Sequence, residues 1–147
     1  MPARFFHLEN SGSPTQWDGT RYLEYLAEVR PRLPSDLQSL TAIERYKLPS
    51  ESDLSLWRSD VTHMQASRDG ITISARNDYR TRRFEFIYSG VCKFQTTSSK
   101  LYFPPTIVIQ ELIQLRNGIF RHTFSDMGGD FTTIHASSLS FEESLLQ

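Results

Sequence analysis

The pattern of hydrophobic and polar positions changes its period once along the chain, close to Trp57. Before this point the apolar residues recur every three or four positions, as they do on one face of a helix. This spacing predicts one helix over residues 21–29 and a second over residues 35–47. Ser35 followed by Gln38 has the form of a capping box at the start of the second helix. Prolines follow both segments and must end them, because proline cannot donate a backbone hydrogen bond.

After Trp57 the apolar residues alternate with polar ones, as in strands with one buried face. Short turns at 68–70, 117–118 and 128–129 divide this region, and Asn-Gly and Gly-Gly provide the positive φ angles that tight hairpins need. The predicted fold class is therefore α+β: two N-terminal helices packed on a single, mainly antiparallel sheet of six or seven strands. The predicted strands are 57–67, 71–76, 82–96, 107–116, 119–127, 130–136 and 138–141.

The longest predicted strand, residues 82–96, should supply much of the core. Gly90 interrupts it and predicts a β-bulge. Simple alternation puts five side chains on one buried face: Phe84, Phe86, Tyr88, Cys92 and Phe94.

The composition fits a single globular domain spanning residues 1–147. We expect an irregular segment at 1–19, helices at 20–48 and the sheet at 55–141. The chain has 147 residues, 38% of them hydrophobic and 22% charged, which is ordinary for a folded protein. One cysteine excludes an intramolecular disulfide, and neither a signal peptide nor a bilayer-length apolar run is recognisable. We therefore expect a soluble, cytoplasmic protein that does not bind a membrane.

Counting across the two glycine turns predicts a polar cluster. With two-residue turns, Ile113 lies opposite His122, and His122 lies opposite His135. Glu111 then shares the same face. Two histidines and a carboxylate are typical ligands of a divalent transition metal with an open coordination position, and a histidine oriented by a carboxylate can act as a general base.

The interpretation we favour for this trio is structural, because a carboxylate among apolar neighbours needs a hydrogen-bond partner and an imidazole can provide one. No cofactor is then expected, and a metal-binding protein or metal-dependent hydrolase using Glu111, His122 and His135 is the alternative. All three interpretations depend on the register. One added residue in either turn moves His122 or His135 to the opposite face.

The loop 76–83 is the sharpest charge feature, with four arginines and one aspartate on a chain whose net charge is −1. Arginine and tyrosine are frequent at protein-interface hot spots, so a protein partner is predicted here. An isolated basic loop on a near-neutral chain argues against nucleic acid, and a plain solvated hairpin tip is the remaining interpretation. The candidate partner-binding residues are Arg76, Tyr79, Arg80, Arg82 and Arg83.

The Gly-rich phosphate loops, nucleophile elbows and zinc-protease motifs that mark common enzymes are absent from the sequence. Several short pieces resemble small bacterial α+β protein families of unknown function, some of which are immunity- or adaptor-like. This resemblance implies a non-catalytic protein-binding module and carries over no active-site residue. The pieces that carry it are Tyr22–Leu26, Leu33-Pro34, Asp60–His63, Tyr88–Val91 and Glu111.

Overall fold

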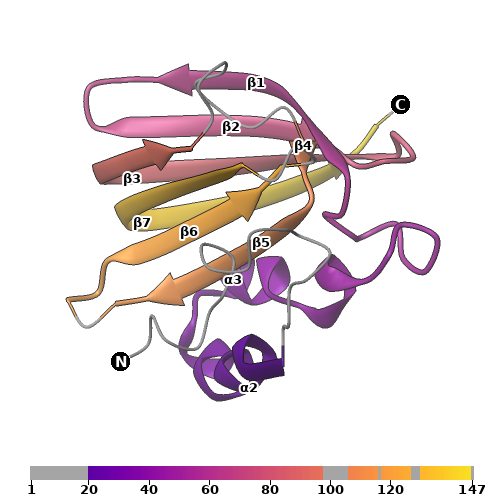
Figure 1. Cartoon of the computed structure of the whole chain (residues 1–147), viewed down its shortest axis with the longest axis horizontal. Coiled ribbons are helices and arrows are strands. Elements are labelled where there is room, and N and C mark those ends of the chain that lie inside the picture. Colours follow the sequence, from indigo (N-terminus) through magenta and orange to yellow (C-terminus); the bar gives the residue numbers. More distant parts are fainter. Residues whose placement is uncertain (1–19, 98–105, 116, 127–129, 147) are drawn as a thin grey trace.

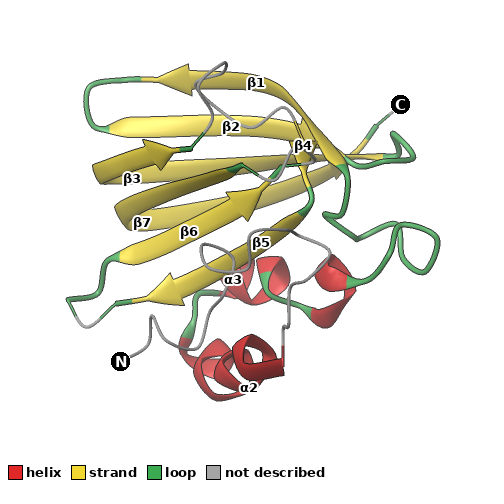
Figure 2. Ribbon diagram, viewed as in Figure 1, coloured by secondary structure: helices red, strands yellow, loops and turns green. Residues whose placement is uncertain are grey.

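A computed structural model describes residues 20–97, 106–115, 117–126 and 130–146 of the chain, and these form two short helices, two 3-10 turns and seven strands (Figures 1 and 2). The predicted α+β class, with helices first and one antiparallel sheet after them, is confirmed. The predicted irregular segment 1–19 and the turn at 128–129 lie outside the described residues. The elements are α2 (Thr20–Val29), η3 (Arg30–Arg32), α3 (Ser35–Leu40), η4 (Ile43–Tyr46), β1 (Ser59–Ala66), β2 (Gly70–Arg76), β3 (Arg82–Thr96), β4 (Thr106–Ile107), β5 (Ile109–Gln114), β6 (Phe120–Ser125) and β7 (Phe131–Leu145).

The second helix is much shorter than its apolar spacing predicts. It ends at Leu40, and Ser35 does not cap it: Pro34 occupies the N-cap position without a side-chain hydrogen bond. The Thr41 hydroxyl donates to the Leu37 carbonyl at 2.7 Å. Threonine competes with the helical ladder in this way, and the chain continues into the separate 3-10 turn η4.

The seven strands form one curled sheet in the order β4-β1-β2-β3-β7-β6-β5, and every pair is antiparallel. Because the sheet is curled, its two edge strands, β4 and β5, follow each other directly in the chain. Ile107 pairs with Ser59 of β1, whereas Ile109 pairs with Ser125 of β6. The Val108 N–H also donates to the Ser125 carbonyl at 2.9 Å, so residues 106–114 connect the first and last strands.

Strand β7 runs along the full length of β3, from the Arg82–Leu145 pair to the Thr96–Thr132 pair. The sequence suggested two short strands here, but 131–145 is continuous. The bulge predicted at Gly90 is confirmed: Gly90 has a φ of 63° and the register shifts between Val91 and Lys93. The extra residue is Cys92, which is exposed; its expected place on the buried face is therefore wrong.

Both hairpin loops of the β5–β6–β7 meander are one residue longer than predicted. The Leu115 N–H donates to the Ile119 carbonyl at 2.7 Å, which leaves a three-residue loop containing Asn117 and Gly118 (φ 83°). Three-residue loops with glycine in the left-handed region are the next most common hairpins. Likewise, the Asp126 N–H donates to the Asp130 carbonyl at 2.9 Å.

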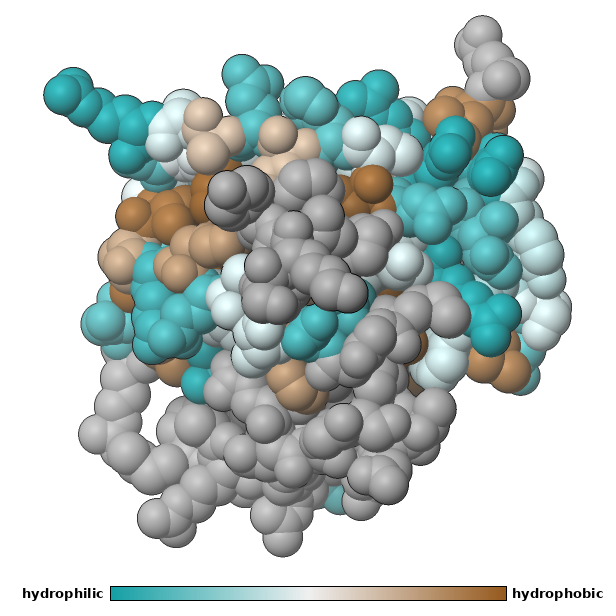
Figure 3. Space-filling model, turned by 45° about the horizontal axis from the view of Figure 1, so that its top comes forward, coloured by the Kyte–Doolittle hydropathy of each residue, from teal (hydrophilic) through white to brown (hydrophobic). Residues whose placement is uncertain are grey.

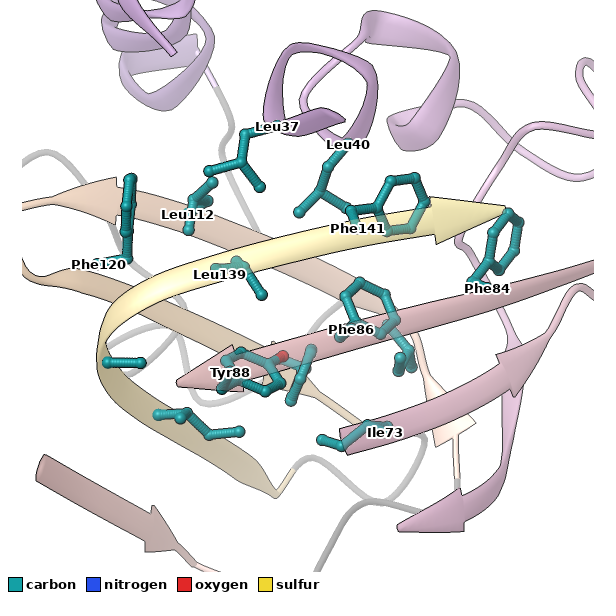
Figure 4. Packing of buried hydrophobic residues seen from close by; sticks show 14 of the residues in the cluster. Leu37, Leu40, Ile73, Phe84, Phe86, Tyr88, Leu112, Phe120, Leu139 and Phe141 are labelled. Atoms are coloured by element: carbon teal, nitrogen blue, oxygen red, sulfur yellow. The ribbon is translucent and has the colours of Figure 1, made fainter. Parts of the chain in front are cut away.

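The main core lies between the concave face of the sheet and the second helix. In Figure 4, Leu37 and Leu40 of α3 point toward Leu112, Leu139 and Phe141 of the sheet. Phe84, Phe86 and Tyr88 of β3 are fully buried in the same cluster, as the alternation predicts. The first helix forms a smaller cluster beside β5, in which Tyr22 and Leu26 pack on Ile113.

Candidate functional site

The predicted cluster of Glu111, His122 and His135 does not form on one face, because the longer loops shift the register by one residue on each side of β6. Glu111 lies opposite Thr123, and His122 lies opposite Leu112 and Ile134. The predicted cross-strand pair of His122 and His135 is therefore wrong, since His135 lies opposite Arg121.

Glu111 and His135 lie on the opposite face of the sheet from His122, which points into the core, and Glu111 is itself buried, at 3% exposure. β6 separates the strands that carry Glu111 and His135, which puts their backbones roughly 10 Å apart across the sheet. Within the described ranges, no group of three histidine, cysteine, aspartate or glutamate side chains could hold a metal ion.

His122 belongs to a buried hydrogen-bond network that joins the sheet to the helices. Its Nδ1 lies 2.8 Å from the Tyr88 hydroxyl, and its Nε2 lies 2.7 Å from Oε1 of Gln110. The Gln110 Nε2 donates to the Leu40 carbonyl at 3.3 Å and to the Tyr46 hydroxyl at 2.8 Å. Gln110 and His122 are 1% exposed, so these partners replace the hydrogen bonds that water would make.

The direction of each bond in this network follows from the Leu40 carbonyl, which can only accept. The Gln110 NH₂ group must therefore face Leu40, and its Oε1 must face His122. Oε1 only accepts, so His122 carries its proton on Nε2 and accepts at Nδ1 from the Tyr88 hydroxyl. Burial lowers the pKa of His122 from 6.5 to about 3. The ring is therefore neutral at pH 7, and both of its nitrogens make hydrogen bonds within the chain.

Tyrosines of the first helix continue the network onto the free edge of β5. The Tyr22 hydroxyl lies 3.0 Å from that of Tyr46 and accepts from the Leu112 N–H at 2.7 Å. The Tyr25 hydroxyl accepts from the Gln114 N–H at 2.9 Å. Burial raises the pKa of all three hydroxyls, so they stay protonated. Helix α2 thus satisfies backbone donors that an edge strand otherwise offers to another chain.

Arg45 makes a second buried polar contact, between η4 and β7. Its guanidinium donates five hydrogen bonds: two to the Glu143 carboxylate at 3.0 Å each, two to the carbonyls of Ser39 and Leu54, and one to the Ser39 hydroxyl. All five N–H groups of the side chain are used, and Arg45 is 3% exposed. The hydrogen bonds from Arg45 hold the pKa of Glu143 below its usual value.

The predicted partner-binding loop is the turn between β2 and β3, and Asn77 holds its shape. The Asn77 Oδ1 accepts from the N–H groups of Thr81 at 2.8 Å and Arg82 at 2.9 Å. Its Nδ2 donates to the Thr81 hydroxyl at 2.8 Å and to the Asp53 carbonyl at 3.2 Å. Asn77 is 3% exposed, so a buried amide fixes the base of an exposed turn.

Two of the five predicted contact residues are engaged within the chain. Arg82 bridges Asp53 at 3.1 Å and Glu143 at 3.6 Å, with its side chain 22% exposed. Arg83 bridges Glu85 at 2.8 Å but keeps half of its side chain exposed. Arg76 is half-buried opposite Arg83 and Asp60. The ion pairs of Arg82 and Arg83 balance part of the local positive charge that the sequence shows.

Tyr79 and Arg80 are the two predicted contact residues that remain open at the tip. Tyr79 is 55% exposed, and Arg80 is exposed with a φ of 59°. A left-handed conformation at a non-glycine residue costs on the order of 1 kcal/mol or more. The Arg80 N–H bonds to the Asn77 carbonyl at 2.9 Å, and its side chain has no hydrogen bond or ion pair among the described residues.

Sequence reasoning missed the residues on which the buried contacts depend, namely Gln110, Tyr22 and Arg45. Each of them has a partner 12 to 98 positions away, so no local pattern identifies these contacts. Asn77 was detectable, because asparagine before aspartate is a turn signal. The exposed Leu145 and Leu146 were missed because the sequence suggested that the last strand ends at Phe141.

Comparison with known proteins finds neither a matching family model nor a matching curated protein. No helix in the described part of the chain is long and apolar enough to span a bilayer.

Proposed function

We propose that this protein is a non-catalytic protein-binding module and that its contact surface is the β2–β3 turn, with Tyr79 and Arg80 at its centre. The observation that carries this proposal is the contrast within the turn. Asn77 is buried and makes four side-chain hydrogen bonds, whereas Tyr79 and Arg80 extend from this fixed base into solvent.

A fixed loop with exposed tyrosine and arginine has the physical properties of an interface hot spot. Both side chains combine apolar area with directional hydrogen bonding and are enriched among residues that dominate binding energy. A turn that is already ordered loses less conformational entropy on binding. The left-handed Arg80 is consistent with this role, because strained backbone positions concentrate at ligand-contacting sites.

The resemblance to immunity- and adaptor-like families supports the same class of function. In such proteins binding, and not chemistry, is the activity. The buried network around His122 is consistent with this, because both ring nitrogens are occupied and the ring cannot take a proton from a substrate without losing a partner.

The proposal is tested by affinity capture with the full-length chain as bait. Lysate of the source cells is passed over wild-type protein, the variant Arg80→Glu and the variant Arg68→Glu, and retained proteins are quantified by mass spectrometry. Arg68 is a matched control, since it is exposed in the turn at the opposite end of β2. Arg82 is left intact because reversing its charge would disturb its ion pairs with Asp53 and Glu143.

We expect a partner that is retained by wild-type and Arg68→Glu protein and lost with Arg80→Glu. Equal retention of every captured protein by all three baits would contradict the proposal.

A further inference from the structure

The two margins of the curled sheet differ in how their backbone groups are used. On β5, tyrosine hydroxyls of α2 accept from the N–H groups of Leu112 and Gln114. On the other margin, β4 pairs with β1 only at Ser59 and Asp60, and no described strand pairs with the outer edge of Thr62–Ala66. Figure 1 shows β1 along this margin. An open strand edge offers its N–H and C=O groups to another chain.

The register of β1 on β2 determines which backbone groups of this open edge point outward. The Ser67 N–H donates to the Gly70 carbonyl at 2.8 Å, and the pairing of the four preceding residues is regular. Hydrogen-bonded and non-hydrogen-bonded pairs alternate in an antiparallel ladder. Gln65 therefore bonds to β2, whereas Met64 and Ala66 direct their N–H and C=O groups away from it.

The open edge Thr62–Ala66 lacks the usual features that protect exposed strands. It contains no proline, lysine, arginine, aspartate or glutamate, and every residue of it except Met64 is exposed. Proteins commonly place such residues at an edge to prevent pairing. Figure 3 brings this margin of the molecule forward and shows hydrophilic and apolar residues mixed there. Association at this edge therefore depends on backbone pairing and not on a large apolar patch.

The segment Met64–Ala66 is complementary to a second copy of itself. When two such strands run antiparallel with Gln65 on a two-fold axis, Met64 of each copy lies opposite Ala66 of the other. Every outward N–H then meets an outward C=O. The long Met64 side chain, which packs on the main core, lies beside a small alanine. The two Gln65 side chains meet on the opposite face of the sheet, and these neutral amides can hydrogen-bond to each other.

A β-bulge fixes the position of this axis. The ladder between β1 and β2 shifts between Val61 and His63, which removes Thr62 from regular pairing. An axis at Met64 would need Thr62 opposite Ala66 and is therefore disfavoured. An axis at Gln65 uses only residues with regular backbone geometry.

We propose that two copies of this protein associate through their β1 edges, with Met64–Ala66 paired antiparallel about a two-fold axis at Gln65. The two sheets then form one continuous sheet. The contact is short, because β4 occupies the edge up to Asp60 and the chain turns away at Ser67, so the dimer is reversible. This inference is independent of the proposed function, since the β2–β3 turn lies at the other end of β2.

The experiment traps the pairing with an engineered disulfide in the full-length chain. The exposed Cys92 is first replaced by serine. Gln65→Cys is then compared with the matched control His63→Cys, since both positions are exposed on the same face of β1. In a non-hydrogen-bonded antiparallel pair the Cα atoms are about 4.5 Å apart, which a disulfide can span. The two copies of residue 63 are roughly 14 Å apart in the same arrangement. Both variants are oxidised at several protein concentrations, and the linked dimer is quantified on non-reducing gels.

We expect Gln65→Cys to form the linked dimer at least about tenfold faster than His63→Cys, because only residue 65 is held next to its copy. Equal rates, or a faster reaction of His63→Cys, would overturn the inference.

Sedimentation equilibrium tests the same pairing without a disulfide. Wild-type protein should dimerise as its concentration rises. Gln65→Lys should lower the association constant by about fivefold, because it places like charges opposite each other, and the uncharged control Gln65→Thr should behave like wild type. Wild-type protein that stays monomeric, or a dimer that Gln65→Lys does not weaken, would overturn the inference. Either result leaves the role of the β2–β3 turn untouched.

Discussion

His122 and Arg80 are both polar residues that the sequence marked as candidates for function, and the structure uses them in opposite ways. His122 is 1% exposed and has a partner at each ring nitrogen. Arg80 is exposed, sits in a strained backbone conformation and has no side-chain partner among the described residues. A buried polar group with every hydrogen bond satisfied fixes a structure, whereas an exposed, unpaired one on a fixed turn remains available to another molecule.

The contrast extends to the surroundings of each residue. Around His122, the groups of Tyr88, Gln110 and Tyr46 connect the sheet to the helices. Around Arg80, Asn77 supports the turn from below without occupying its outer side. Polar side chains therefore stabilise the fold around His122 and remain exposed around Arg80. Substitutions in the two regions should consequently affect different measurements.

The largest effect is expected from Arg45→Ala. The change removes five hydrogen bonds and leaves the Glu143 carboxylate with only its longer ion pair to Arg82 at 3.6 Å. Removing one partner of a buried ion pair costs about 3–5 kcal/mol, and we expect a loss near the lower figure because Glu143 is 26% exposed. Urea denaturation measures it. Arg45→Lys should recover only part of the loss, since lysine cannot reproduce the two-bond contact; full recovery would contradict this account.

Replacing His122 with leucine should lower the free energy of unfolding at pH 7 by about 2–3 kcal/mol, because Tyr88 and Gln110 each lose a buried partner. Wild-type stability should also depend on pH. Between pH 6.5 and about 3 the unfolded chain binds a proton at His122 that the folded chain does not. The contribution of neutral His122 to the free energy of unfolding is complete above pH 6.5. It falls by about 1.4 kcal/mol per pH unit below this value.

The pH dependence distinguishes the effect of protonating His122 from the effect of losing its packing and hydrogen bonds. Urea denaturation from pH 7 to pH 4 should give a flatter profile for His122→Leu than for wild type. The variant Tyr88→Phe, which keeps the imidazole, should lose about 1 kcal/mol and retain the wild-type slope. Equal slopes for wild type and His122→Leu would show that the ring is not buried as described.

Asn77→Ala should affect both stability and binding, because the buried Asn77 side chain holds the exposed β2–β3 turn in place. We expect a loss of about 1–3 kcal/mol from the unsatisfied donors around it, together with weaker partner binding from a less ordered turn. Asn77→Asp keeps the Oδ1 acceptor for Thr81 and Arg82 and should bind better than the alanine variant. Thermal unfolding and partner affinity are measured on the same samples. Normal affinity in Asn77→Ala would show that the turn needs no support.

The smallest effects on stability are expected at the tip. Tyr79→Ser and Arg80→Glu should change the free energy of unfolding by no more than about 0.5 kcal/mol, as surface substitutions usually do. Arg80→Gly should be neutral or slightly stabilising, because glycine adopts a positive φ without steric strain. A destabilisation above 2 kcal/mol in any of these variants would show that Tyr79 and Arg80 stabilise the fold, which would contradict their proposed role in binding.

The sequence predicted the α+β class and the strand 82–96, because alternation and turn residues are local signals that the sheet obeys. It did not predict the register of the meander. Asn117 and Gly118 fit a two-residue or a three-residue loop equally well, and one residue decides whether His122 faces His135 or Ile134. The candidate metal cluster depended entirely on that one residue.

The five candidate partner-binding residues lie in and beside the β2–β3 turn, as their clustering in the sequence implies, and their role in binding stays a prediction. Clustered arginines identify a loop, but they do not show which of them meets a carboxylate elsewhere in the chain. Arg82 meets Asp53 and Glu143, which lie 29 and 61 positions away. Leu145 and Leu146 were not predicted, because their exposure follows from the length of β7 and its pairing with β3.

The most direct test of the contrast between these regions is amide hydrogen exchange of the full chain, alone and with the partner captured in the affinity experiment. Binding at the tip should slow exchange in residues 78–83 and 144–146 and leave residues 110–114 and 120–124 unchanged. Slower exchange in the β5–β6 hairpin, with no change in the β2–β3 turn, would contradict the account and return function to the sheet around His122.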